Sequence, residues 1–391
     1  MQVALKAPMS GDLVWASVMR PRIPLVYLDL NTIIYIAKAL RGDKNVPAGY
    51  RELYDSVMLA KVEQRAMFPL GGSHLWEVTK ITDPKQRQLL AQVMEAFSDF
   101  NYLPGRVTIA ELEFDAGIAK VMAEKPRLEA ISLLRPTFGQ LFGVVGGMNI
   151  VDADGRDSSE TVRAEMTEED YFALRRRMNI EVERHMLRGP SDEELLELRR
   201  DPNYRPGVAL ASHQRRVELE VDAQSILNED PKWRRGRLRD FVGAREIVHE
   251  WNDMLARMRV ERIRSGLPAF EPGEDQFRSF VGSMPHTQVA ISVKTQMHRN
   301  PRHTWTPNDI SDVDAVSVAY AYCEAVFPDK AIRHALLSSK ELNALGTFVP
   351  RRATDLTAWL DAVPTIVGPT LLVPHPLVNR VVSEVPDTMS L

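Results

Sequence analysis

The stretch IPLVYLDLNTIIYIAKAL, residues 23–40, places one acidic side chain, Asp29, inside an otherwise apolar run. Residues 23–30 are rich in Ile, Val and Leu and lie beside two prolines, a pattern typical of a buried strand. Asn31 and Thr32 are residue types that cap helices, and apolar residues then recur at helical spacing. The sequence therefore predicts that Asp29 ends a strand at the sheet edge where ligands bind. The alternative is that Asp29 only caps the following helix.

The amino-acid composition limits the classes of protein to which the chain can belong. The chain has 391 residues, 44% of them hydrophobic and 26% charged, which indicates a globular protein with one large domain or two ordinary ones. The single cysteine, Cys323, excludes an internal disulfide and a cysteine-rich zinc site, and it favours a reducing compartment. Residues 1–20 lack the apolar core of a signal peptide, and no apolar run is long enough to span a membrane. We therefore expect a cytoplasmic protein with no membrane partner.

Charge is unevenly distributed along the chain. The formal net charge is −4, but residues 232–264 hold ten Lys or Arg against five Asp or Glu, so the rest of the chain carries −9. No acidic residue occurs between Gln276 and Asn308. A basic surface beside an acidic cluster suits a protein that holds phosphates near metal ions. A solvated helical face with arginine ion pairs would leave the same pattern, and both interpretations stay open.

The pattern of elements changes twice along the chain. Residues 1–110 are predicted to be α/β, with helices near 50–64, 73–80 and 83–100, and residues 111–304 are predicted to be a mostly helical insertion. Residues 305–391 return to α/β, with a helix from 306, a strand at 325–327, a helix at 330–337, a strand near 346–349 and a C-terminal arm. The predicted fold class is α/β, a parallel sheet flanked by helices and interrupted by a large helical insertion.

Acidic residues recur at the expected strand ends and helix starts. Glu77 lies on a short predicted helix, Asp312 and Asp314 lie near the start of a late helix, and Asp329 follows a second short apolar strand. Carboxylates that converge repel one another unless a cation lies between them. Because no cysteine or histidine cluster accompanies them, oxygen-only ligands favour Mg²⁺ or Mn²⁺ over zinc. Such ions bind a scissile phosphate and activate water.

The segments YLDLNTI, SHLWEV and NDISDVDAVSVAYAYCEAVFPD together resemble the PIN-like metal-dependent nucleases. Members carry an Asp after the first strand, an acid on a middle helix, an Asp opening a late helix and an Asp after the next strand. Asp29 with Asn31 matches the first element, Glu77 the second, Asp312 or Asp314 the third and Asp329 the fourth. The resemblance covers about residues 23–100 and 305–350. It implies a PIN-like parallel sheet and a hydrolase that uses Mg²⁺ or Mn²⁺, usually on RNA.

The third acidic position has two candidates. Asp312 precedes Asp329 by seventeen positions, closer to the usual family interval than the fifteen from Asp314, so we choose Asp312 and keep Asp314 as the alternative ligand. Asp309 is expected to belong to the helix cap instead. The residues expected to contact substrate or support the site are Asn31, Thr32, Arg234, Arg235, Arg237, Arg299 and Arg302.

Two further functions compete with an endoribonuclease. The stretch YLDLNT also resembles the first motif of haloacid-dehalogenase-type phosphatases, but Asn31 stands where their general acid would be, and an amide cannot donate and recover a proton. The chain could instead be a non-catalytic nucleic-acid-binding or interaction module on a degenerate PIN-like fold. Retention of four mutually repelling carboxylates favours the enzyme. RNA is the expected partner, and a homo-oligomer or a regulatory protein partner is compatible with the sequence.

Overall fold

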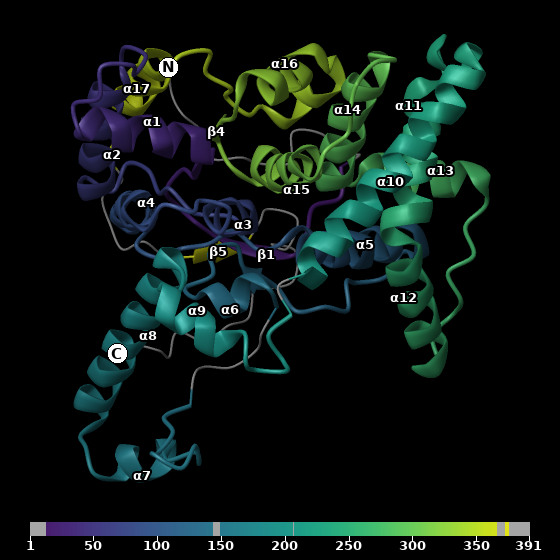
Figure 1. Cartoon of the computed structure of the whole chain (residues 1–391). Coiled ribbons are helices and arrows are strands. Elements are labelled where there is room, and N and C mark those ends of the chain that lie inside the picture. Colours follow the sequence, from purple (N-terminus) through teal and green to yellow (C-terminus); the bar gives the residue numbers. More distant parts are fainter. Residues whose placement is uncertain (1–12, 144–148, 206, 366–371, 375–391) are drawn as a thin grey trace.

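The computed structural model describes residues 13–143, 149–205, 207–365 and 372–374, and helices dominate it (Figure 1). The first group of elements is β1 (Val18–Pro21), β2 (Val26–Leu28), α1 (Leu30–Leu40), α2 (Tyr50–Val62), α3 (Gly72–Val78) and α4 (Pro84–Ser98). The last group is α15 (Pro307–Tyr322), β4 (Ala325–Phe327), α16 (Lys330–Ser338), the 3₁₀ helix η3 (Lys340–Leu345), α17 (Ala353–Ala362) and β5 (Leu372–Pro374).

Between these groups the described chain is almost entirely helical. It comprises α5 (Arg106–Met122), β3 (Ile131–Ser132), α6 (Phe138–Leu141), α7 (Ser159–Ala164), α8 (Glu168–Arg188), α9 (Asp192–Leu198), α10 (Gly207–Glu229), the 3₁₀ helix η1 (Pro231–Arg234), α11 (Leu238–Arg245), the π-helical turn η2 (Glu246–Trp251), α12 (Asn252–Arg264), α13 (Glu274–Ser283) and α14 (Pro285–Arg299). The boundary predicted at residue 110 falls within α5. None of the described helices is long and apolar enough to cross a membrane.

Short parallel pairing joins the first and last groups of elements. β2 and β4 pair in parallel, with Leu28 opposite Phe327, so their carboxyl ends meet. Isolated parallel bridges extend this pair to Phe348 on one side and to Met67 on the other. A second small sheet has β1 at its centre, parallel to β3 and antiparallel to β5.

The expected parallel sheet is therefore present in the described residues only as short pairs and single bridges within a mostly helical protein. Its segments are short because prolines and helix starts stop them: Pro24 precedes β2, Pro328 follows β4, and α1 begins at Leu30. The sequence also predicted Asn31 and Thr32 as helix caps, and this was wrong, because Asp29 is the N-cap and both residues lie inside α1. Most of the predicted C-terminal arm lies outside the described residues.

The β2–β4 pair is buried between two helical layers. Val26, Leu28 and Phe327 belong to a core shared with α1, α2, α4 and α17, whereas Tyr27 and Val326 face a second core shared with α14, α15 and α16. Successive strand residues thus face opposite layers, as the period of a strand requires. Figure 1 shows the first layer at the left and the second at the upper centre. A strand buried on both faces explains the apolar run around Asp29.

The helices of the predicted insertion pack closely against the layers on either side. α14 packs along α15 and α16, α5 packs against α14 and α15, and α8 packs against α4. In Figure 1, α10 to α13 form the right-hand side of the molecule, and α7 with the outer part of α8 projects below it.

A buried charge network fastens several of these helices together. The ammonium of Lys294 on α14 lies 2.8 Å from Glu220 on α10 and 2.7 and 3.4 Å from Glu246 and Glu250 on η2. Burial alone would lower the pKa of Lys294, but the three carboxylates outweigh it and raise that pKa above its ordinary value. Glu250 also pairs with Arg106 on α5 at 2.7 Å. Lys294 therefore contacts all three glutamates, and Arg106 and Arg216 supply further positive charge to Glu250.

Removing that cation tests its role. We expect Lys294→Met to lower the free energy of unfolding by about 3–5 kcal/mol, because it leaves the buried carboxylate of Glu246 without its cationic partner. Chemical denaturation followed by circular dichroism measures the change. Lys232→Met is the control, since Lys232 pairs with Asp230 at the surface and such pairs contribute about 0–1 kcal/mol. Adding Glu246→Gln to Lys294→Met should recover part of the loss; equal stability of Lys294→Met and wild type would contradict this account.

Candidate metal centre

Asp29 is positioned by the pairing of β2 with β4. Its backbone N–H donates to the carbonyl of Phe327 at 3.1 Å, and its own carbonyl accepts from the N–H of Thr32 at 2.9 Å. The carboxylate makes no capping hydrogen bond to α1. Instead Asn31 Nδ2 donates to Asp29 Oδ2 at 3.2 Å. The main chain of Asp29 therefore starts the helix, while its half-buried carboxylate accepts a hydrogen bond from the Asn31 side chain.

His74 fixes the helix that carries Glu77. Its Nδ1 accepts from the N–H of Gly71 at 2.9 Å, so the proton lies on Nε2, which donates to the carbonyl of Leu28 at 2.7 Å. Burial lowers the pKa of His74 to about 4, which keeps the ring neutral. The start of α3 is thereby tied to the residue that precedes Asp29, and Glu77 follows one helical turn later.

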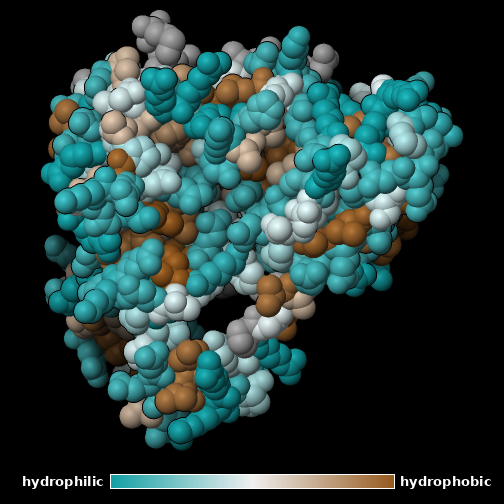
Figure 2. Space-filling view, turned by 45° about the horizontal axis from the view of Figure 1, so that its top comes forward, coloured by the Kyte–Doolittle hydropathy of each residue, from teal (hydrophilic) through white to brown (hydrophobic). Residues whose placement is uncertain are grey.

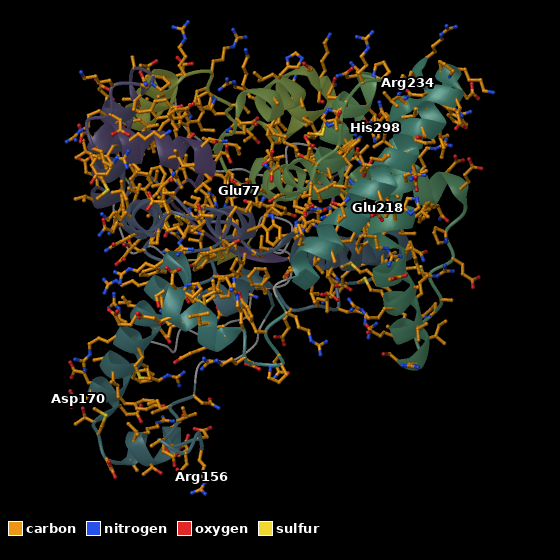
Figure 3. The ribbon with its side chains drawn as sticks, in the orientation of Figure 1. Glu77, Arg156, Asp170, Glu218, Arg234 and His298 are labelled. Atoms are coloured by element: carbon orange, nitrogen blue, oxygen red, sulfur yellow. The ribbon has the colours of Figure 1, made fainter. Side chains whose placement is uncertain are left out.

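Three carboxylates meet at this point. Asp29, Glu77 and Asp312 each present an oxygen that lies within 4.8 Å of an oxygen of the other two. They come from the end of β2, from α3 and from α15, and Figure 3 shows Glu77 at the centre of the molecule. Asp329 lines the same small hollow as Asp29 and Asp312. Its Oδ1 accepts from the N–H of Ile332 at 2.7 Å, so Asp329 also caps α16.

Burial and mutual repulsion raise the pKa values of this cluster. Burial, and to a smaller extent Asp329, raise the pKa of Asp29 to about 6 although Asn31 opposes the shift. Burial and Asp29 raise the pKa of Glu77 to about 7. Burial, followed by Asp29 and Glu77, raises the pKa of Asp312 to about 8. Each carboxylate therefore loses its proton less readily than in water, unless a cation enters the cluster.

The two carboxylate triads of the described chain differ in their counter-ions. Glu220, Glu246 and Glu250 also lie within 4.8 Å of one another, and Lys294 fills the space among them. No Lys, Arg or His in the described ranges forms an ion pair with the Asp29 cluster. Its donors are carboxylate oxygens from three separate elements, which is the ligand set that Mg²⁺ and Mn²⁺ prefer. These residues fit a divalent ion.

Asp314 lies apart from this cluster. Its two oxygens accept from Arg216 at 2.6 and 2.7 Å, and Arg106 lies 3.3 Å away. The arginines outweigh burial and lower its pKa. Residues two apart on a helix point to different faces, so Asp312 and Asp314 cannot serve one site. Asp314, kept as the alternative metal ligand, lies in the buried charge network, and the structure groups Asp312 rather than Asp314 with Asp29 and Glu77.

The other predicted site residues divide into two groups. Asn31 contacts Asp29 as described, whereas Thr32 is buried inside α1. Arg234 donates to the carbonyls of His298 and Leu227 and to Asn228 Oδ1, so its guanidinium is engaged within the fold, and its contact with substrate stays a prediction. The remaining arginines of this set are exposed and form no ion pair with a described carboxylate: Arg235, Arg237, Arg299 and Arg302.

A second helix reaches the site from the insertion. His213 on α10 stacks on Trp76, with ring centres 4.9 Å apart and planes 6° apart, and Trp76 directly precedes Glu77. Lys80 lies 5.1 Å from the centre of the same indole ring and donates to Asn308 Oδ1 at 2.7 Å. These contacts join α3, α10 and α15 at the edge of the cluster. Sequence reasoning missed His74 and His213 because each acts on a residue distant in the chain.

Comparison with known proteins adds no assignment: no protein-family model, curated protein or solved structure matches the chain.

The raised pKa values predict how stability depends on pH and metal. A carboxyl whose folded pKa exceeds its unfolded pKa stabilises the fold below about pH 4, and this contribution is lost as pH rises through about 6 to 8. Mn²⁺ should therefore raise the melting temperature at pH 8 and have little effect at pH 5. A Mn²⁺ concentration of about 100 times its Kd would raise the free energy of unfolding by about 2.7 kcal/mol.

The matched control is the triple variant Asp29→Asn, Glu77→Gln and Asp312→Asn. It keeps other titrating groups, such as Glu113, whose pKa burial raises to about 8. The difference between wild type and variant across pH 4–9 isolates the cluster. An equal response of both proteins to Mn²⁺ would show that the ion binds elsewhere.

Proposed function

We propose that this protein is a Mg²⁺- or Mn²⁺-dependent nuclease, specifically an endoribonuclease that hydrolyses phosphodiester bonds. The observation that carries the proposal is the convergence of Asp29, Glu77 and Asp312, from segments almost three hundred residues apart. Lys80 partly opposes the rise of the Glu77 pKa, but its ammonium donates to Asn308 Oδ1 at 2.7 Å and forms no ion pair with the three carboxylates. A cluster of mutually repelling carboxylates costs stability, and a site for a divalent ion accounts for that cost.

The PIN-like fold is part of the same proposal. Asp29 directly follows β2, and Asp329 follows β4 after Pro328, in line with the first and fourth acidic positions of the resemblance. The parallel bridges to Met67 and Phe348 lie on either side of that pair. Helices cover both faces of the pair. This arrangement supports a PIN-like core whose strands are short and whose insertion, residues 111–304, is large.

The residues present suit hydrolysis. Asp29, Glu77 and Asp312 would hold the ion, with Asp329 beside them. A bound divalent ion lowers the pKa of water and neutralises charge on the phosphate. Asn31 orients the Asp29 carboxylate through its hydrogen bond, and His74 keeps Glu77 in place through Leu28. The raised pKa values keep these carboxyls partly protonated near pH 7, so binding of the ion is expected to release protons.

The proposal is tested with Asp29→Asn. We expect Mn²⁺-dependent cleavage of a fluorescent single-stranded RNA to fall to the level of a no-enzyme control, because one ligand of the ion is lost. The melting temperature without metal should be unchanged or higher, since one source of repulsion is removed. Gel electrophoresis of the products and calorimetry supply the two readouts.

Asp314→Asn provides the matched control on α15. It removes a carboxylate two residues from Asp312 but leaves the cluster intact, so we expect cleavage per folded molecule to persist while the protein becomes less stable through loss of its Arg216 pair. Full activity of Asp29→Asn, or loss of activity in Asp314→Asn alone, would refute this assignment of the site.

A further inference from the structure

A second site lies on the insertion, in a surface hollow where η1, α11 and η2 meet. The hollow has a volume of about 410 Å³ and is lined by Trp233, Arg237, Phe241, Arg245 and Val248, with Asp240 as its one carboxylate. This volume lies in the range of small-molecule sites. Figure 2 shows apolar side chains breaking the otherwise polar surface of the lobe that contains α10 to α13. We call this feature the aromatic hollow.

The two aromatic rings of the aromatic hollow are anchored from within. Trp233 and Phe241 have ring centres 5.8 Å apart and planes inclined by 44°. Both are half-buried and pack on a small core that contains Leu227, Leu238 and Ile291. Each ring therefore has one part held by the fold and another part facing the hollow, which is the form of a stacking platform.

A guanidinium lies over each ring, so a stacked base would take the remaining ring surface or displace the arginine. The guanidinium of Arg237 lies 5.1 Å from the ring centre of Trp233, and that of Arg245 lies 5.7 Å from the ring centre of Phe241. Arg237 is exposed and forms no ion pair with a carboxylate of the described chain. A ligand that has both a flat apolar face and negative charge would match this lining.

The π-helical turn joins the aromatic hollow to a second one. Val248 and His249 on η2 line both the aromatic hollow and a polar hollow of about 400 Å³ that includes Arg106, Arg215 and Ser212. A π-helical turn is uncommon and often marks a functional site. Val248 is 60% exposed, an unusual position for a valine beside two aromatic rings. The two hollows therefore form one stretch of surface.

Helix α10 extends from this surface toward the candidate metal centre. Its Ser212 lines the polar hollow, and the adjacent His213 stacks on Trp76, next to Glu77. α10 also contacts η1, which carries Trp233, and α15, which carries Asp312. In Figure 3 the labels of Glu77, Glu218 on α10 and Arg234 on η1 follow this order from the centre to the upper right. Both sites thus share one supporting helix.

We propose that the aromatic hollow binds a base of single-stranded RNA, with Trp233 and Phe241 stacking on the base and Arg237 contacting an adjacent phosphate. The inference rests on the proposed function, because the RNA would be the strand cut at the metal centre. Bases of a duplex are stacked inside it and cannot enter a hollow between side chains. Of the basic residues in 232–264, Arg235 and Arg237 are exposed and form no ion pair with a described carboxylate, and they favour a polyanion over an apolar peptide.

The experiment measures binding without cleavage. The Asp29→Asn protein in EDTA is titrated into a 5′-fluorescein oligouridylate of about 12 nucleotides, and anisotropy reports the affinity. We expect Trp233→Leu, which keeps apolar bulk but loses the ring, to weaken binding roughly 5- to 150-fold, and Trp233→Phe to retain most of it. Arg237→Gln should lower the slope of log affinity against log salt by about 0.7.

Arg156→Gln is the matched charge control, because Arg156 is exposed and lies at the lower end of the part of the molecule that contains α7 and the outer part of α8 (Figure 3). It should leave affinity and slope unchanged, and none of these variants should change binding of an RNA duplex of equal length. If Trp233→Leu melts like the parent protein and binds the oligouridylate equally well, the inference is overturned and the hollow serves a protein partner.

The two proposals fail in different ways. Suppose that Trp233→Leu loses oligouridylate binding and that the wild-type protein shows no Mn²⁺-dependent cleavage. This pair of results would support the aromatic hollow as an RNA site and refute the nuclease. Cleavage that depends on Asp29, combined with unchanged binding by Trp233→Leu, would support the nuclease and refute the hollow as an RNA site.

Discussion

The parallel pairing of β2 with β4 is the constraint on which the arrangement of this protein depends. The hydrogen bond from the N–H of Asp29 to the carbonyl of Phe327 joins two segments almost three hundred residues apart. Because parallel strands end at the same edge, it brings Asp29 and Asp329 to one place and sets the base on which α3 and α15 add Glu77 and Asp312. The insertion must leave and return without disturbing this pair.

The two carboxylate triads of the described chain differ in the cations that surround them and in the pKa values of their carboxyl groups. Around Lys294, three glutamates form a network in which the ammonium of Lys294, together with Arg106 and Arg216, supplies positive charge. Around Asp29, the same number of carboxylates remains without such a partner in the described residues, and their pKa values rise. A protein that can neutralise one triad with lysine has the means to neutralise the other. The difference therefore supports an external cation at the second triad.

Local patterns in the sequence predicted what local physics controls. The strand before Asp29, the short strand at 325–327 and the helices that became α2, α4, α15 and α16 follow from apolar spacing and breakers. What failed depends on distant partners. The hydrogen bond from Arg234 to a backbone carbonyl could not be predicted from the sequence. β1 was not expected either, because four residues ending in a proline carry little strand signal. The pairing of Asp314 with Arg216 was equally hidden, since α10 approaches α15 only in the folded chain.

Helix α10 links the chemistry of the core to the surface of the insertion. On one face, Arg216 pairs with Asp314 of α15 and with Glu250 of η2, so the helix is held by charges of both parts. One turn earlier His213 packs on Trp76, and near its other end Leu227 supports Trp233 and Phe241. A helix of 23 residues spans roughly 35 Å. These contacts of α10 therefore connect the insertion to the helices that carry Trp76 and Asp314, and the proposed RNA strand would have to follow this surface to reach both sites.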